Sequence, residues 1–152
     1  KYILLAIDEI KKLSQVVMPP ILKEIGLTDS IDNWIRLQQK ENTINFITDW
    51  KKFNDSVTSD KLQLTIYRIV QEQLNNAIKY SKATNVFIRL EQKDNLLELT
   101  IKDDGVGFDV LNNTKGVGLQ NIDTRAEIHN GKMTLTSQPG DGCTLRVVFP
   151  LQ

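Results

Sequence analysis

The sequence predicts an α+β domain, a two-layer α/β sandwich with a mixed, mostly antiparallel sheet, preceded by part of a helical region. Three observations favour this class. The front of the chain has helical periodicity, one long amphipathic helix stands in the middle, and two pairs of short strands are each joined by a short turn. With 152 residues, 40% of them hydrophobic and 25% charged, the chain has the composition of one globular domain with an appendage.

The front of the chain is expected to be helical. Apolar residues recur over 2–18 with a period near 3.6, which predicts an amphipathic helix that Pro19 and Pro20 must stop or kink. A second helix is expected over 30–39, where Ser30 or Asp29 would cap the exposed backbone amides. Because the chain begins with lysine and not with methionine, we expect it to be a segment of a longer protein.

The body is expected to follow over 42–152, after a helical region over 1–41. The strand expected first places the residues at 44, 46, 48 and 50 on one face, and Ser59 is expected to cap the long helix after it. A turn at 93–95 would join one antiparallel pair of strands, and Gly131 would end the last helix. The expected elements are strands over 43–50, 85–92, 96–102, 132–137 and 143–149, and helices over 60–80 and 116–130.

Charge and composition exclude several classes of partner. The 19 basic and 19 acidic residues cancel and form no basic run, so nucleic acid is not an expected partner. No apolar run approaches the ~20 residues that cross a bilayer, so we do not expect this segment to contact a membrane. Cys143 is the single cysteine, which excludes an internal disulfide and fits a cytoplasmic location.

Three polar residues of the long helix follow one another along a narrow stripe. Glu72, Asn76 and Lys79 stand at i, i+4 and i+7, beside the apolar face. A solvated helix edge would explain them. A ligand site would also explain them, because an amide oxygen suits Mg²⁺, a carboxylate can order water or metal, and an ammonium can meet a phosphate. The trio alone leaves both interpretations open.

Two glycine clusters favour the site. Asp103 ends a strand in the stretch DDGVGF, and its acceptor-only carboxylate suits an exocyclic amine such as that of adenine. Gly105 and Gly107 permit close approach of a ligand to the backbone, although a β-turn alone would also explain them. Gly116 and Gly118 lead into a helix whose N-terminal amides attract anions. Neither cluster has the spacing of a P-loop or of a dinucleotide fingerprint.

These stretches together resemble a known family, the ATP-binding domains of sensor histidine kinases, whose fold is shared with gyrase, mismatch-repair ATPases and heat-shock chaperones. YRIVQEQLNNAIKYSKA resembles the N box, DDGVGF the first glycine box, GVGLQNIDTRAEIHNG the second, and DGCTLRVVFP the closing strand. IDEIKKLSQVVMPPILKEIGL is similar to the second dimerisation helix of nitrate-sensor-like kinases. The resemblance covers nearly the whole body, in the family's order.

The resemblance implies an enzyme, a protein histidine kinase that uses ATP and Mg²⁺. It implies transfer of the γ-phosphoryl group to a histidine on a preceding helix, homodimerisation of the full-length protein, and relay to a response regulator receiver domain. His129, at a predicted helix end, is not expected to accept the phosphoryl group. Another ATPase of this fold, such as an anti-sigma serine kinase, and a dimerisation module that binds no nucleotide remain alternatives.

The resemblance also implies roles for individual residues. Asp103 would hold the adenine amine with Thr144 assisting through water, Asn76 would hold Mg²⁺, and Glu72 would polarise the nucleophile. Asp104 stands where Asn is commoner and is expected to weaken nucleotide binding unless it faces solvent or Mg²⁺. The segment 109–115 is expected to form a short lid. The remaining implied nucleotide contacts are Lys79, Tyr80, Gly105, Gly107, Gly116, Gly118 and Leu119.

Overall fold

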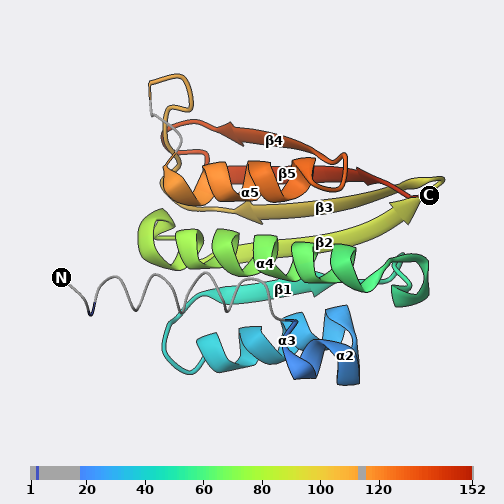
Figure 1. The fold of residues 1–152 in the computed structure, drawn as a ribbon. Helices are drawn as coiled ribbons and strands as arrows, with labels where there is room; N and C mark the ends of the chain where they lie inside the picture. Colours follow the sequence, from blue (N-terminus) through green and yellow to red (C-terminus); the bar gives the residue numbers. More distant parts are fainter. Residues whose placement is uncertain (1–2, 4–17, 113–115, 152) are drawn as a thin grey trace.

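Helices lie across one face of a five-stranded sheet (Figure 1). The computed structural model describes residues 3, 18–112 and 116–151. The strands are ordered β1-β2-β3-β5-β4, with β1 parallel to β2 and every other neighbouring pair antiparallel. This confirms the predicted α+β sandwich. The strands are β1 (Asn45–Asp49), β2 (Asn85–Lys93), β3 (Leu96–Asp103), β4 (Lys132–Ser137) and β5 (Cys143–Pro150).

The two hairpins form where the turn residues predicted them. Asp94, between β2 and β3, has a φ of 53°, a left-handed conformation that Asp tolerates better than most residues. Gly140 and Gly142 have φ values of 90° and 70° in the turn between β4 and β5. Buried and less buried residues alternate along β5, so the sheet presents an apolar face to the helices.

The long central helix is α4 (Asp60–Asn76), and it begins at the predicted cap. The Ser59 hydroxyl accepts a hydrogen bond from the Leu62 amide at 3.3 Å, which satisfies one of the free amides of the first turn. Its buried stripe includes Ile66, Ile69 and Leu74. The helix does not stay regular to its predicted end, because Ala77–Ser81 forms a single π-helical turn. Such turns are frequent at functional sites.

The front of the chain differs from the prediction. Two helices, α2 (Pro20–Ile25) and α3 (Leu27–Gln38), are separated by Gly26, whose φ is 83°. Helix α3 therefore begins earlier than expected, and Ser30 does not cap it. The Ser30 hydroxyl instead donates to the Gly26 carbonyl, one turn back inside the helix. The helix predicted over 2–18 lies outside the described residues, apart from positions 3 and 18.

Helices α2 and α3 pack into the same core as the body. Leu22, Leu27 and Ile31 are almost fully buried in one apolar cluster with the core residues of α4. The indole of Trp50 donates to both carboxylate oxygens of Asp32 at 3.1 Å, which ties the end of β1 to α3. The core is thus continuous across the predicted boundary at 41/42, and that division stays a prediction.

Helix α5 (Val117–Glu127) is shorter than the predicted helix. The left-handed residue after it is Asn130, with a φ of 54°, and not the expected Gly131. The Gly131 amide closes the helix by donating to the Ala126 carbonyl at 2.8 Å. Glycine is needed at 131 for another reason, since a Cβ there would press on the ring of Phe149. The helix thus ends three residues before its predicted end at about 130, and the amide of Gly131 closes it.

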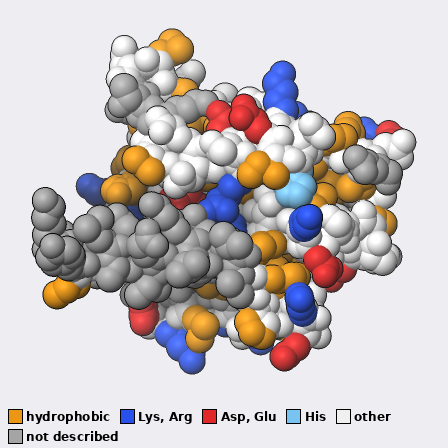
Figure 2. All heavy atoms as spheres, in the orientation of Figure 1, with side chains coloured by type: hydrophobic (Ala, Val, Ile, Leu, Met, Phe, Trp, Pro, Cys, Tyr) orange, Lys and Arg blue, Asp and Glu red, His pale blue; other side chains and the backbone are white. Residues whose placement is uncertain are grey.

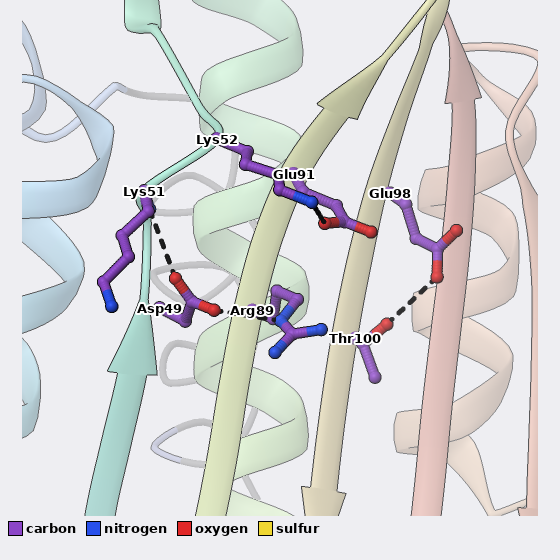
Figure 3. Close-up of polar contacts among 7 residues, drawn as sticks. All are labelled: Asp49, Lys51, Lys52, Arg89, Glu91, Glu98 and Thr100. Carbon is purple, nitrogen blue, oxygen red and sulfur yellow. Dashed lines mark hydrogen bonds and ion pairs between the residues drawn. The ribbon is translucent and has the colours of Figure 1, made fainter.

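The sheet face opposite the helices is mostly polar, although Ile47 and Phe87 are partly exposed on it. Figure 3 shows its side chains in front of the sheet, with Arg89 reaching Asp49 at 3.1 Å and Lys52 reaching Glu91 at 3.7 Å. Such exposed pairs contribute little to stability. In Figure 2 the opposite, helical side carries basic, acidic and hydrophobic side chains interspersed and not gathered by sign. Within the described residues, no helix has the length and apolarity that crossing a bilayer demands.

Candidate functional site

A cavity of about 500 Å³ lies where the end of α4, the end of β3 and the start of α5 meet. Its volume is within the range of small-molecule sites. The structure brings most of the predicted site residues to it but leaves Gly105 and Thr144 outside its lining. The predicted residues that line it are Glu72, Asn76, Lys79, Tyr80, Asp103, Gly107, Gly116, Gly118 and Leu119.

Asp103 provides a buried carboxylate at one wall of the cavity. It is the last residue of β3 and only 3% exposed. Burial raises its pKa, hydrogen bonds from the backbone amides of Gly105 and Cys143 oppose that rise, and the charge of Asp104 adds to it. The Gly105 amide donates to Oδ1 at 3.0 Å, which fixes the orientation of the carboxylate. A carboxylate held in this way can accept a hydrogen bond from a ligand amine.

Glu72, Asn76 and the start of α5 form a second polar wall. A Cβ on Gly118 would lie 2.5 Å from Glu72 Oε1 and 3.4 Å from Asn76 Nδ2. Glycine at 118 therefore lets the first turn of α5 pack directly against these two side chains. Among the described residues no side chain caps α5, and the first amides of a helix can bind an anion. The wall combines anion-binding amides with hard oxygen ligands.

Lys79 and Tyr80 lie in the π-helical turn, exposed at the rim of the cavity. The same turn anchors the first glycine cluster, because the Val106 amide donates to the Ser81 carbonyl at 2.8 Å. A Cβ on Gly105 would collide with that carbonyl. Gly105 thus permits a close backbone contact and, contrary to expectation, does not itself line the cavity.

The rest of the DDGVGF loop is held by the β4–β5 hairpin. The Phe108 amide donates to the Ser137 hydroxyl at 2.9 Å, and the Gly140 amide donates to the Val106 carbonyl at 2.7 Å. Gly107 has a φ of 60°, and a Cβ there would collide with the Gln138 carbonyl. The loop is therefore fixed on both sides before any ligand arrives.

Thr144 does not reach the cavity, and its neighbour Cys143 does. Successive side chains of a strand point to opposite faces, and Cys143 is the residue paired with Asp103 across β3 and β5. The prediction was therefore displaced by one residue along the closing strand: it named Thr144, whereas the structure places Cys143 at the cavity. Burial raises the pKa of Cys143 to about 11, with the Asp103 charge adding to the rise, so the thiol stays protonated at neutral pH.

Asp104 faces away from the cavity, toward the start of β2. Its carboxylate accepts hydrogen bonds from the Thr84 amide at 2.8 Å, the Asn85 amide at 2.9 Å and the Asn85 side chain at 2.8 Å. These bonds, those from Asn85 above all, lower its pKa. Asp104 therefore adds no charge to the lining of the cavity, and it joins the end of β3 to the start of β2.

Asp104→Asn should lower the melting temperature at pH 7 without changing nucleotide affinity. Because the folded protein holds the pKa of Asp104 below its usual value, the carboxylate stabilises the fold above its unfolded pKa, and this stabilisation is lost as pH falls through the folded pKa. Thermal unfolding of both proteins between pH 7 and pH 3 should show the difference shrinking with acidity. A difference that persists unchanged at pH 3 would contradict this role.

Several other cavity residues were not predicted. Gln73, Val106 and Phe108 also line the cavity. Gln73 was missed because it is a polar residue on the buried side of α4, which hydrophobic periodicity assigns to apolar residues. Of the predicted lid, residues 109–112 are described and residues 113–115 are not. Within the described part, the Asp109 carboxylate accepts a hydrogen bond from the Leu111 amide at 2.9 Å. His129 is remote from the cavity and contacts the Thr65 hydroxyl at 2.9 Å.

The part of the chain that forms the cavity matches a known protein family. Residues 61–152 match the family described as Histidine kinase-, DNA gyrase B-, and HSP90-like ATPase. The chain belongs to this ATPase family. The match runs from the first turn of α4 to the end of the chain and therefore contains every residue that lines the cavity of this ATPase-family domain.

Individual relatives of this ATPase-family domain are sensor kinases by name. The sensor histidine kinase ComP of Bacillus subtilis is 35% identical over 127 residues, 82% of this chain and 16% of ComP. The oxygen sensor histidine kinase NreB of Staphylococcus carnosus is 29% identical over 147 residues, 95% of this chain and 42% of NreB. The chain thus spans less than half the length of these curated relatives.

A solved structure shares the fold. The mycobacterial sensor histidine kinase MprB superposes with a TM-score of 0.61 at 23% identity, over 82% of this chain and 94% of that chain. At this identity the likeness concerns the fold alone. It agrees with the mixed five-stranded sheet and its helical layer.

Proposed function

We propose that this chain is the ATP-binding catalytic part of a two-component sensor histidine kinase of the nitrate-sensor-like kind. Family membership and the names of its relatives support a sensor kinase. The front motif IDEIKKLSQVVMPPILKEIGL and the relationship to NreB support the subfamily. In the parent protein, an upstream helix would carry the phosphoacceptor histidine, two copies would form a homodimer, and a response regulator would receive the phosphoryl group in the cytoplasm.

The observation that carries the proposal is the polarity of the cavity. One wall offers the buried, acceptor-only carboxylate of Asp103. The other offers open backbone amides at the start of α5 together with Glu72 and Asn76. A base with an exocyclic amine fits the first wall, and a phosphate chain fits the second. ATP has both parts.

The residues of the chain would divide the work as follows. Asp103 accepts the adenine amine and orients the base, while the α5 amides and Lys79 compensate the charge of the phosphates. Glu72 lies beside Gly118 at the phosphate end, where it polarises the incoming nucleophile. Catalysis of phosphoryl transfer then rests on positioning and charge compensation. Tyr80 and Leu119 border the nucleotide. Residues 1–41 form the C-terminal part of a helical dimerisation and phosphotransfer region, and residues 42–152 form the ATP-binding catalytic domain.

Asn76 is the proposed protein ligand of Mg²⁺. Its amide oxygen is a hard ligand, and Mg²⁺ commonly takes one or two protein ligands and completes its shell with water and phosphate oxygens. The lining fits this, because the described residues contain no group of three or more His, Cys, Asp or Glu side chains able to hold a metal by themselves. When bound, Mg²⁺ would neutralise phosphate charge.

The direct test is phosphotransfer from γ-labelled ATP to the parent protein. We expect label on a histidine outside this chain, recognised because phosphohistidine is labile in acid and stable in base. The isolated chain should bind ATP but take up little label. Absence of ATP binding, or label that survives acid, would overturn the proposal.

Asn76→Ala should blunt the Mg²⁺ dependence of ATP binding, because the proposed metal ligand is lost. Calorimetric titration of ATP with Mg²⁺ and with a chelator measures the dependence for each protein. Asn75→Ala is the matched control, since Asn75 precedes it on α4 and does not line the cavity. Equal Mg²⁺ dependence in the Asn76 variant and the parent would reject the ligand role.

A further inference from the structure

Gln73 is a buried amide on the cavity side of α4. It is 4% exposed, and its Oε1 is buried without a hydrogen-bond partner among the described residues. Gln73, Asn76, Ala77 and Tyr80 stand at i, i+3, i+4 and i+7, and all four line the cavity. The side of the helix that carries Gln73 therefore faces the cavity.

The burial of this oxygen without a partner needs a cause. Native proteins pair nearly all buried polar side-chain atoms, because an unpaired one loses its bonds to water without replacement. Another buried glutamine of the same helix follows the rule, since Gln63 Nε2 donates to the Asp55 carbonyl at 3.1 Å and to the Thr58 carbonyl at 3.4 Å. Gln63 does not line the cavity. The two amides thus differ in both respects.

We propose that the Gln73 carboxamide is a second base-recognition group, which hydrogen-bonds the purine directly or through one bound water. The inference rests on the proposed ATP site and adds to it a specificity residue. Asp103 can only accept a hydrogen bond when ionised, whereas a carboxamide both accepts and donates. The adenine amine carries two N–H donors beside a ring-nitrogen acceptor. Gln73 Oε1 can therefore accept the second N–H, or a water bound to it, while the Gln73 NH₂ group can donate to the ring nitrogen.

The test is Gln73→Met, which keeps an unbranched side chain of similar length and removes the amide. We expect ATP affinity to fall about three- to tenfold, the loss of one hydrogen bond, and the preference for ATP over GTP to narrow by the same factor. Calorimetry with ATP, and competition by GTP, measure these values. The melting temperature of the nucleotide-free protein should rise, because an unpaired buried oxygen is removed.

Gln63→Met is the matched control. It removes two hydrogen bonds far from the cavity, so we expect a lower melting temperature with unchanged ATP affinity and unchanged base preference. A role of Gln73 in stability alone would give Gln73→Met that same pattern, or would weaken ATP and GTP binding equally. Either result, or unchanged affinity with unchanged base preference, would overturn the proposal.

The outcomes separate this inference from the function on which it rests. If the parent protein binds ATP and Gln73→Met behaves like the parent, only the role of Gln73 fails. If the parent protein binds no ATP, the proposed function fails first, and the base-recognition role fails with it.

Discussion

Asp103→Asn should weaken ATP binding about thirtyfold. The wild-type carboxylate accepts hydrogen bonds from the backbone amides of Gly105 and Cys143. In the proposed site it also accepts one from the adenine amine. Asparagine offers one acceptor oxygen and places an NH₂ group against a donor, so a charge-assisted bond is lost. Such a bond contributes about 2 kcal/mol, which is roughly thirtyfold in affinity. Calorimetric titration of ATP measures the change.

Asp104→Asn is the natural control for this experiment. It changes the adjacent carboxylate in the same chemical way, but Asp104 bonds to the start of β2 and does not line the cavity. Its ATP affinity should match that of the parent protein. The pH dependence provides a second check. ATP binding should weaken as pH falls and Asp103 takes up a proton, and because the pKa of Asp103 is raised, this weakening should begin at a higher pH than for an ordinary aspartate. Unchanged affinity in Asp103→Asn would remove this residue from base recognition.

Gly107→Ala should destabilise the fold by about 2–3 kcal/mol and weaken ATP binding as well. Two costs add at this position. Alanine at a φ of 60° is strained by about 1 kcal/mol, and its Cβ would collide with the Gln138 carbonyl, which belongs to the backbone and cannot rotate away. The loop must then leave the β4–β5 hairpin. Urea unfolding measures the stability, and calorimetry measures the affinity.

Gly116→Ala is the matched control in the second glycine cluster. Gly116 has a φ of −61°, and a Cβ there would meet no atom of the described residues within 4 Å. Its stability should stay within about 0.5 kcal/mol of the parent, as for most surface substitutions. Equal stability of Gly107→Ala and the parent would show that the loop relaxes freely, against the anchoring described above.

Much of the fold was predictable because the spacing of hydrophobic residues in the body changes between the helical and the strand period from one element to the next. The strands of both hairpins and the Ser59 cap of α4 were located from side-chain alternation, turn residues and capping chemistry alone. The start of α3 was missed because Gly26 in a left-handed conformation redirects the chain, and no serine or aspartate is needed there. A cap is a preference, and tertiary burial of Leu27 outweighs it.

The site was predictable where helical spacing or strand ends bring residues together. The helix period places Glu72, Asn76 and Lys79 on one stripe, and a strand end places Asp103, but it was the resemblance to a known family that indicated one shared site. Thr144 was predicted at the cavity, where the structure has Cys143 instead. Neighbouring residues of a strand point to opposite faces, and the strand register that selects one of them is not evident from the sequence. The orientation of Asp104 depends on the amides of Thr84 and Asn85, at and just before the start of β2, which lie 20 and 19 residues away in the chain and which no local pattern indicates.

The shared core of α2, α3 and α4 has a mechanical consequence. Each fully buried leucine or isoleucine contributes about 1.5–3 kcal/mol, so pulling Leu22, Leu27 and Ile31 away from α4 would cost several kcal/mol. A motion that separated residues 20–38 from the rest of the domain would therefore have to expose these side chains to water.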